Sequence, residues 1–243
     1  MAKILIIPDT HARDFWKDAK NLIDDYEKVI FLGDYVDPYP YEFNLSTDEL
    51  REKTIADFVE IINFCKDYPD KVILLDGNHL LHYLDKDYAC SRYDRTLGPR
   101  IHTLYVDNAN LFHSCYLIDD VLFTHAGVSK EWVDYLQTCF HLEYTGDPVK
   151  FIESCDLDQL LMCGGYRGGW DACSGPEWLD IDELKHLTPL PGFFQIFGHS
   201  QVGYTGGPVV KEHYAGVDTQ TIYEFDTKTH ELKMLQELPK CQY

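Results

Sequence analysis

The sequence contains no apolar run of about 18 residues, so it predicts no membrane-spanning helix. Residues 1–11 reach Pro8 and Asp9 too early for the apolar region of a signal peptide. None of the eight cysteines forms a CxxC pair, which leaves no spacing typical of a zinc finger or ribbon. These absences together predict a cytoplasmic protein with reduced thiols and no membrane partner.

Basic residues are scarce as well. The chain has 21 Lys and Arg against 41 Asp and Glu, which gives a net charge of −20. Such a field repels nucleic acids, so we expect no nucleic-acid partner. The same field disfavours phosphate substrates unless bound cations reverse the sign of the potential locally.

No repeat, linker or low-complexity tract interrupts the chain. Its 243 residues, 45% of them hydrophobic, are sufficient for one large core. We therefore expect a single domain of the α/β class over residues 1–243.

Five short apolar runs predict buried strands, and polar residues follow each of them directly. The run at residues 29–32 is apolar throughout, which is typical of a strand buried on both faces of a parallel sheet. The predicted strands, each with its polar residues, are Lys3–Pro8 with Asp9 and His11, Val29–Leu32 with Asp34 and Asp37, Lys71–Asp76 with Asn78 and His79, Val121–Thr124 with His125, and Phe193–Phe197 with His199.

Helices are predicted between these strands. About ten residues around Ala19 read as an amphipathic helix, and Ser46 with Glu49 forms a capping box before a long helix that ends short of Pro69. Ser129 and Asp147 are predicted caps of two later helices. Residues 209–235 read as antiparallel strands and a hairpin.

The polar residues after the strands predict a metal site, because the carboxyl ends of parallel strands meet at one edge of a sheet. Any one of these residues alone is more often a turn, a cap or a core residue; the argument rests on five such blocks in one chain. Two carboxylates, one amide and three imidazoles suit Mn²⁺, Fe or Zn²⁺. The set exceeds the needs of one tetrahedral ion and fits two ions bridged by Asp34, an arrangement suited to displacement at phosphorus.

The ordered blocks D-x-H, G-D-x-x-D, G-N-H, H-A-G and G-H resemble the calcineurin-like metallophosphoesterase superfamily. They stand at residues 9–11, 33–37, 77–79, 125–127 and 198–199. The stretches GDYVD, THAGVS and GHSQVGY, and the later residues 216–219, look most like the serine/threonine protein phosphatase branch and its bacterial and phage relatives. The resemblance implies a four-layer sandwich of two mixed sheets flanked by helices.

The resemblance also implies roles for the residues of these blocks. One metal ion would be held by Asp9, His11 and Asp34, and a second by Asp34, Asn78, His125 and His199. We expect two divalent or trivalent ions, Mn, Fe or Zn with Mn favoured, and a hydroxide between them as the nucleophile. His79 would protonate the leaving oxygen, and Asp37 would fix the tautomer of His79.

Two positions depart from the phosphatase pattern. The chain has Pro38 where the phosphatases have an arginine that grips phosphate, and Leu80 where they have a glutamate. Part of the phosphate recognition must come from elsewhere, and Arg167 in GGYRGG is the first candidate, because a guanidinium binds phosphate through two hydrogen bonds. A solvated turn arginine is an equally good interpretation of Arg167. The weaker candidates are Arg13, Arg92 and Arg95.

The resulting hypothesis is a phosphomonoesterase that acts on small phosphomonoesters or phosphoproteins. A phosphodiesterase or a dinucleoside polyphosphate hydrolase on the same site stays open, as does a non-catalytic relative that serves as an interaction module. A serine hydrolase is not supported, because the G-x-S-x-G motif would need glycine where the chain has Val202.

Overall fold

The computed structural model describes residues 3–202 and 207–236. Its first sheet has six strands in the order β11-β10-β1-β2-β3-β4. Strands β1 to β4 are parallel, and β10 and β11 are antiparallel additions at one edge. The strands are β1 Lys3–Ile7, β2 Lys28–Phe31, β3 Val72–Leu75, β4 Phe112–His113, β10 Tyr223–Asp226 and β11 Glu231–Met234.

The second sheet has five strands in the order β5-β6-β7-β9-β8. Strands β6, β7 and β9 are parallel, while β5 and β8 pair antiparallel at the two edges. Its strands are β5 Cys115–Ile118, β6 Val121–Thr124, β7 Phe194–Gln201, β8 Val209–Val210 and β9 Tyr214–Asp218. Both sheets are therefore mixed, as the family resemblance implied.

The two sheets pack face to face through an apolar core. Alternate residues of β1 and β2, such as Ile4, Ile6 and Ile30, point to this core, and Phe123 and Ile196 meet them from the second sheet. The opposite residues of the same strands face a layer of helices, because successive side chains on a strand point to opposite faces. This double burial explains why the strands are continuous apolar runs.

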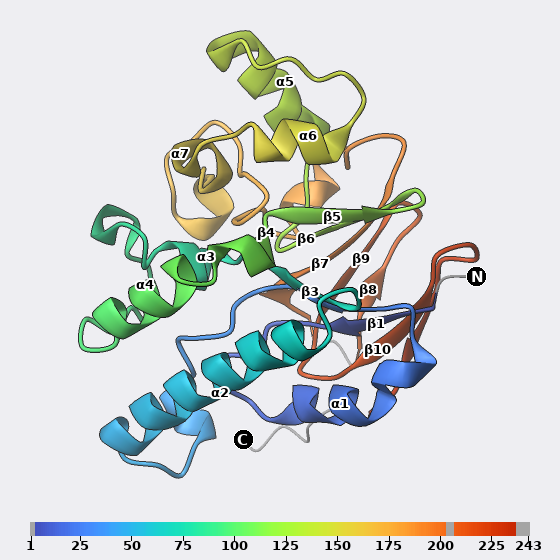
Figure 1. Cartoon of the computed structure of the whole chain (residues 1–243). Coiled ribbons are helices and arrows are strands. Elements are labelled where there is room, and N and C mark those ends of the chain that lie inside the picture. Colours follow the sequence, from blue (N-terminus) through green and yellow to red (C-terminus); the bar gives the residue numbers. More distant parts are fainter. Residues whose placement is uncertain (1–2, 203–206, 237–243) are drawn as a thin grey trace.

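Helices cover the outer face of each sheet (Figure 1). On the first sheet, Phe58 and Ile62 of the long helix α2 pack against Phe31 of β2. On the second sheet, Trp132 of α5 packs in one cluster with Leu122 of β6. The helices are α1 Ala19–Leu22, α2 Thr47–Asp67, α3 Asn78–Leu81, α4 Gly98–Val106, α5 Lys130–Phe140, α6 Pro148–Glu153 and α7 Leu157–Leu160. The order of layers is thus helix, sheet, sheet, helix, and the predicted single-domain sandwich is confirmed.

Short 3₁₀ turns complete the secondary structure of the described residues. They are η1 Phe15–Asp18, η2 Ile23–Asp25, η3 Pro40–Glu42, η4 Lys86–Tyr88, η5 Ala109–Leu111, η6 Gly165–Arg167 and η7 Glu183–Lys185. None of the described helices is long and apolar enough to cross a bilayer.

The predicted helix starts are present as expected. The Ser46 side chain accepts a hydrogen bond from the Glu49 amide, and the Glu49 carboxylate accepts one from the Ser46 amide, which completes the capping box. Ser129 and Asp147 cap α5 and α6.

Other local predictions were wrong. The helix expected around Ala19 is broken into η1, α1 and η2. Strand β7 does not end before His199 but continues to Gln201 through an irregularity in its pairing with β9. Strand β9 is parallel to β7, whereas the whole of residues 209–235 was expected to be antiparallel. The short strands β4 and β5 were not predicted.

Candidate metal and phosphoester site

Six buried side chains meet where the strands of the two sheets end. Four of them follow β1, β2 and β3 of the first sheet, and two come from β6 and β7 of the second. The six residues are Asp9, His11, Asp34, Asn78, His125 and His199, all at most 9% exposed. We call these six residues the strand-end cluster. The structure brings together every residue that the sequence predicted as a metal ligand.

The strand-end cluster contains two overlapping groups of ligand atoms. Asp9, His11 and Asp34 form one group, and Asp34, His125 and His199 form the other; within each group the atoms lie within 4.8 Å of one another. Asn78 joins the second group, since its Oδ1 is 3.0 Å from Nε2 of His125. Asp34 is the residue common to both groups, which is the position that a bridging carboxylate must have.

The backbone is unusual where it delivers these side chains. His11, Asp34 and His199 have φ angles of +43°, +47° and +58°, in the left-handed region that residues other than glycine rarely adopt. Gly198 makes room beside them, because a Cβ there would lie 2.1 Å from Oδ1 of Asp9. Strained backbone of this kind persists only where the surrounding structure enforces it, and such places are often functional sites.

The donor atoms of the cluster fit metal ions. Nδ1 of His11 donates to the carbonyl of Val36 at 2.6 Å, and Nδ1 of His125 donates to that of Leu32 at 2.8 Å. Each ring therefore presents the lone pair of its Nε2 to the cluster. Nε2 of His125 faces Nδ1 of His199 at 3.2 Å and Asn78 Oδ1 at 3.0 Å. Several acceptors thus converge on one another, and bound cations would satisfy them all.

The charges of the region also favour bound cations. Burial lowers the pKa of His11 and of His199, which keeps both rings neutral as metal ligands require. Burial raises the pKa of Asp9 to about 6. Burial, followed by the charge of Asp9, also raises the pKa of the nearby Asp218. The positive charge of a bound cation would offset the free-energy cost of burying these carboxylates close together.

A proton-donor pair lies beside the cluster. Nδ1 of His79 is 2.8 Å from Oδ2 of Asp37, and the Tyr83 hydroxyl donates to the other oxygen of Asp37. The backbone amide of His79 donates to Oδ1 of Asp34 at 2.9 Å, so His79 is held directly against the cluster. Burial lowers the pKa of His79, but the carboxylates of Asp34 and Asp37 raise it more, to about 10. The arrangement can hold an imidazolium next to the ligand cluster.

The family model for calcineurin-like phosphoesterases matches residues 2–203. The chain belongs to that family. Its members depend on two metal ions, so the chain is a metal-dependent phosphohydrolase with a phosphorylated substrate. A comparison with the curated proteins gave no match.

Solved structures of two phosphatases share the fold. A cold-active protein tyrosine phosphatase from a psychrophilic Shewanella species aligns with a TM-score of 0.54 and 18% identity, over 97% of this chain and 81% of that one. A protein serine/threonine phosphatase from Saccharomyces cerevisiae, described as similar to human phosphatase PP5, aligns with a TM-score of 0.55 and 14% identity, over 98% of this chain and 82% of that one. At such identities the likeness extends to the fold alone.

This calcineurin-like phosphoesterase has Arg92 against the pair of His79 and Asp37. The guanidinium of Arg92 donates to the carbonyl of Asp37 at 2.7 Å, and its other terminal nitrogen is 2.8 Å from Nε2 of His79. It also stacks on the ring of Tyr39, 3.7 Å from the centroid. The sequence marked Arg92 only as a weak candidate, because nothing in its spacing ties it to Asp37, 55 residues away.

The remaining arginine candidates lie in different surroundings. Arg167 is near His199, but its Nε pairs with Asp180 at 2.7 Å and its Nη2 donates to Ser200 at 3.0 Å. Arg13 is engaged by Glu42 through two hydrogen bonds. Arg95 is exposed.

Two residues that the sequence did not suggest complete the surroundings of Asp37 and His79. Nε2 of His82 lies 2.8 Å from Oδ2 of Asp37, although without an aligned hydrogen bond. Sγ of Cys90 lies 3.0 Å from Nδ1 of His82 and 3.8 Å from Nδ1 of His79. Neither His82 nor Cys90 belongs to a recognisable motif. The short distance along the chain between Cys90 and the G-N-H block is the one feature of the sequence that could have suggested Cys90.

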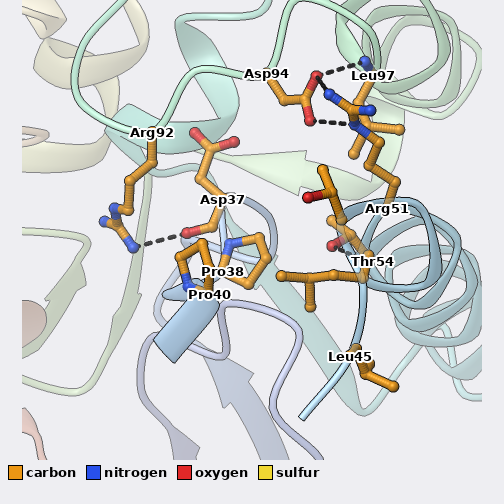
Figure 2. Close-up of a pocket in the computed structure, with 11 residues that line it drawn as sticks. Asp37, Pro38, Pro40, Leu45, Arg51, Thr54, Arg92, Asp94 and Leu97 are labelled. Carbon is orange, nitrogen blue, oxygen red and sulfur yellow. Dashed lines mark hydrogen bonds and ion pairs between the residues drawn. The ribbon is translucent and has the colours of Figure 1, made fainter. Parts of the chain in front are cut away.

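A pocket of about 190 Å³ adjoins this part of the site. Figure 2 shows Arg92, Asp37 and two prolines on one side of it and Arg51 and Leu45 on the other. The wall is largely apolar, and Arg51 is neutralised by Asp94, 2.7 Å from its Nε. Such a pocket suits an uncharged or apolar group better than a second phosphate.

Proposed function

We propose that the chain hydrolyses phosphomonoesters in the manner of the serine/threonine phosphatases, with two bound Mn²⁺ ions and with His79 as the general acid. The observation that carries the proposal is the pair of His79 and Asp37, 2.8 Å apart, directly beside the ligand cluster. A proton donor at this position assists departure of the alkoxide of a phosphomonoester. An alkoxide is a poor leaving group unless it is protonated as the bond to phosphorus breaks.

The residues of the strand-end cluster would hold the two ions in the groups described above. When bound, the ions would supply positive charge at the phosphate and lower the pKa of an attacking water. The mixed oxygen and imidazole donors suit Mn²⁺, Fe and Zn²⁺, of which we favour Mn²⁺. Metal analysis of protein purified without added metal tests the choice of Mn²⁺.

His79 is prepared for proton transfer by its neighbours. Asp37 accepts from Nδ1 and leaves Nε2 for the leaving oxygen of the substrate. The pKa of His79 is raised to about 10, which favours the protonated ring once Nε2 is free of Arg92. Tyr83 holds the second oxygen of Asp37 and so limits rotation of that carboxylate.

Arg92 takes the role of the phosphate-gripping arginine that the chain lacks at Pro38. Its contact with Nε2 of His79 requires a neutral imidazole, since a guanidinium only donates. A phosphate that arrives between the two side chains would accept from Arg92 and free Nε2 to carry the proton. Arg92 would thus exchange an internal partner for the substrate.

The adjoining pocket supports a substrate with an apolar group close to the phosphate. It shares Asp37 and Arg92 with the site and presents Leu45 and Leu97. Phosphopeptides and aromatic phosphomonoesters satisfy this description. Both phosphatases named above act on phosphorylated proteins according to their descriptions, so phosphotyrosine and phosphoserine peptides belong in the same test.

One substrate panel tests the proposal. Mn²⁺-loaded protein is assayed with p-nitrophenyl phosphate, bis(p-nitrophenyl) phosphate, nucleotides, dinucleoside polyphosphates and phosphopeptides, before and after chelation. We expect monoesters to exceed diesters by roughly 100-fold in kcat/KM, with all turnover lost on chelation. Preference for a diester or a dinucleoside polyphosphate would replace the proposed substrate class.

We also propose a cytoplasmic location, which the free thiols of the described cysteines support.

A further inference from the structure

A second group of metal-binding atoms adjoins the strand-end cluster at Asn78, whose Nδ2 lies 3.8 Å from Sγ of Cys90. Ligand atoms of His79, His82 and Cys90 all lie within 4.8 Å of one another. Neither His82 nor Cys90 belongs to the strand-end cluster, and the proposed mechanism assigns them no role. The group therefore needs an explanation of its own.

The geometry of this group matches a site for one cation. Sγ of Cys90 is 3.0 Å from Nδ1 of His82 and 3.8 Å from Nδ1 of His79, separations close to those between ligands around a tetrahedral ion. Oδ2 of Asp37 lies 2.8 Å from Nδ1 of His79 and 2.8 Å from Nε2 of His82. Asp37 thus contacts both rings, and it meets His82 at the nitrogen opposite the one that faces Cys90.

Burial and access also fit a metal site. His82 is 1% exposed, and its Nδ1 faces both Sγ of Cys90, at 3.0 Å, and the backbone amide of Cys90, at 3.3 Å. Cys90 is only partly buried and stands between the exposed residues 89 and 91. A cation could therefore reach the thiol from solvent without passing through the strand-end cluster.

We propose that His79, His82 and Cys90 form an inhibitory site for a thiophilic divalent cation such as Zn²⁺, next to the two-ion site. One thiolate and two imidazoles select Zn²⁺ over Mn²⁺ or Mg²⁺. Binding releases the thiol proton of Cys90 and the hydrogen that Nδ1 of His79 donates to Asp37, both to solvent, and forms bonds to Sγ of Cys90 and to Nδ1 of both histidines.

Inhibition follows from the loss of the general acid, and this part rests on the proposed function. With Nδ1 bound to a cation, His79 can no longer share it with Asp37. The hydrogen bond through which Asp37 orients the ring is then lost, so His79 no longer presents Nε2 to the leaving oxygen in the productive orientation. The enzyme would keep both Mn²⁺ ions and still lose the rate on substrates with poor leaving groups.

Binding is tested first, without any assay of turnover. Cd²⁺ serves as the probe for protein whose two-ion site is filled with Mn²⁺, because a cadmium–thiolate bond absorbs in the near ultraviolet. We expect one further equivalent of Cd²⁺, the thiolate absorption, and protection of Cys90 from iodoacetamide, with the Mn²⁺ content unchanged. Cys90→Ser should abolish the absorption, while Cys139→Ser, which removes an exposed thiol elsewhere, should preserve it.

Inhibition is then measured with Zn²⁺ on an alkyl phosphate, each variant being compared with its own rate without Zn²⁺. Cys90→Ser and His82→Gln should each raise the inhibitory concentration by roughly tenfold or more, and Cys139→Ser should not. Uptake of Cd²⁺ only with release of Mn²⁺, unprotected Cys90, or equal inhibition of Cys90→Ser would each overturn the proposal. If the chain turned over no phosphoester at all, the cadmium absorption and the alkylation would still decide the binding site.

Discussion

The strand-end cluster and the segment from His79 to Leu97 contribute to the same site in different ways. The members of the cluster lie in a strand or shortly after its end, and their ligand atoms face one another. The segment is mostly irregular, with α3 and the single 3₁₀ turn η4 before α4, yet it delivers the proton donor and Arg92. The sheets thus provide a fixed place for metal ions, and the segment provides the groups that must exchange partners during turnover.

The largest effect is expected at the centre of the strand-end cluster. Asp34→Asn keeps the shape of the side chain but removes the charge common to both ligand groups, so metal and activity should be lost together, roughly 10⁴-fold in kcat/KM. Metal analysis and turnover are measured on the same preparation. Asp48→Asn, at an acid whose side chain is 92% exposed, is the control and should change neither. Full metal content with normal activity would remove Asp34 as the bridge.

The next effect separates the two regions from each other. His79→Asn should retain metal, because His79 is not in the strand-end cluster, but should lower kcat on alkyl phosphates by about 100- to 1,000-fold. On p-nitrophenyl phosphate, whose leaving group needs little protonation, the loss should be much smaller. The ratio of the two rates is the measurement. An equal loss on both substrates would show that His79 acts in some other way.

A smaller effect distinguishes the two arginines. Arg92→Ala should weaken phosphate binding by roughly 10- to 100-fold in KM, the value of one or two hydrogen bonds to a charged group. Arg167→Ala is the matched control, and it should change KM less, because Arg167 is already paired with Asp180. Inhibition by inorganic phosphate gives the same comparison without turnover. A larger effect at Arg167 would reverse the assignment.

The smallest predicted effect concerns pH. The rate should fall as pH rises through the pKa of His79, because the imidazolium is the proton donor. The charge of Asp34 and the hydrogen bond to Asp37 raise that pKa, so Asp37→Asn should lower it and move the alkaline limb of the kcat profile to lower pH, by roughly one unit or more. The metal content is measured in parallel, and a profile that keeps its alkaline limb would contradict the role of Asp37.

The same contrast shows how far the sequence alone could go. The ligand residues could be predicted because each follows an apolar run, and buried parallel strands place their carboxyl ends at one edge. The position of Arg92 could not be predicted, because it is set by an irregular loop in which Arg92 itself has a left-handed backbone, with φ +65°. No hydrophobic periodicity indicates such a position. The parallel pairing of β9 with β7 was missed for a related reason. Tertiary contacts decide which strands are neighbours in a sheet, and the residues of β9 do not indicate whether it runs parallel or antiparallel to its neighbour.

The position of the site between two sheets has a consequence for folding. Asp9 follows the first strand of one sheet, and the amide of His199 in the other sheet donates to its carboxylate across 190 positions of the chain. Ions held by residues of both sheets would bind the folded chain and not the unfolded one, because only folding brings these residues together. Such binding stabilises the folded state by mass action. Chelation should therefore lower the melting temperature of the whole sandwich as well as stop its chemistry.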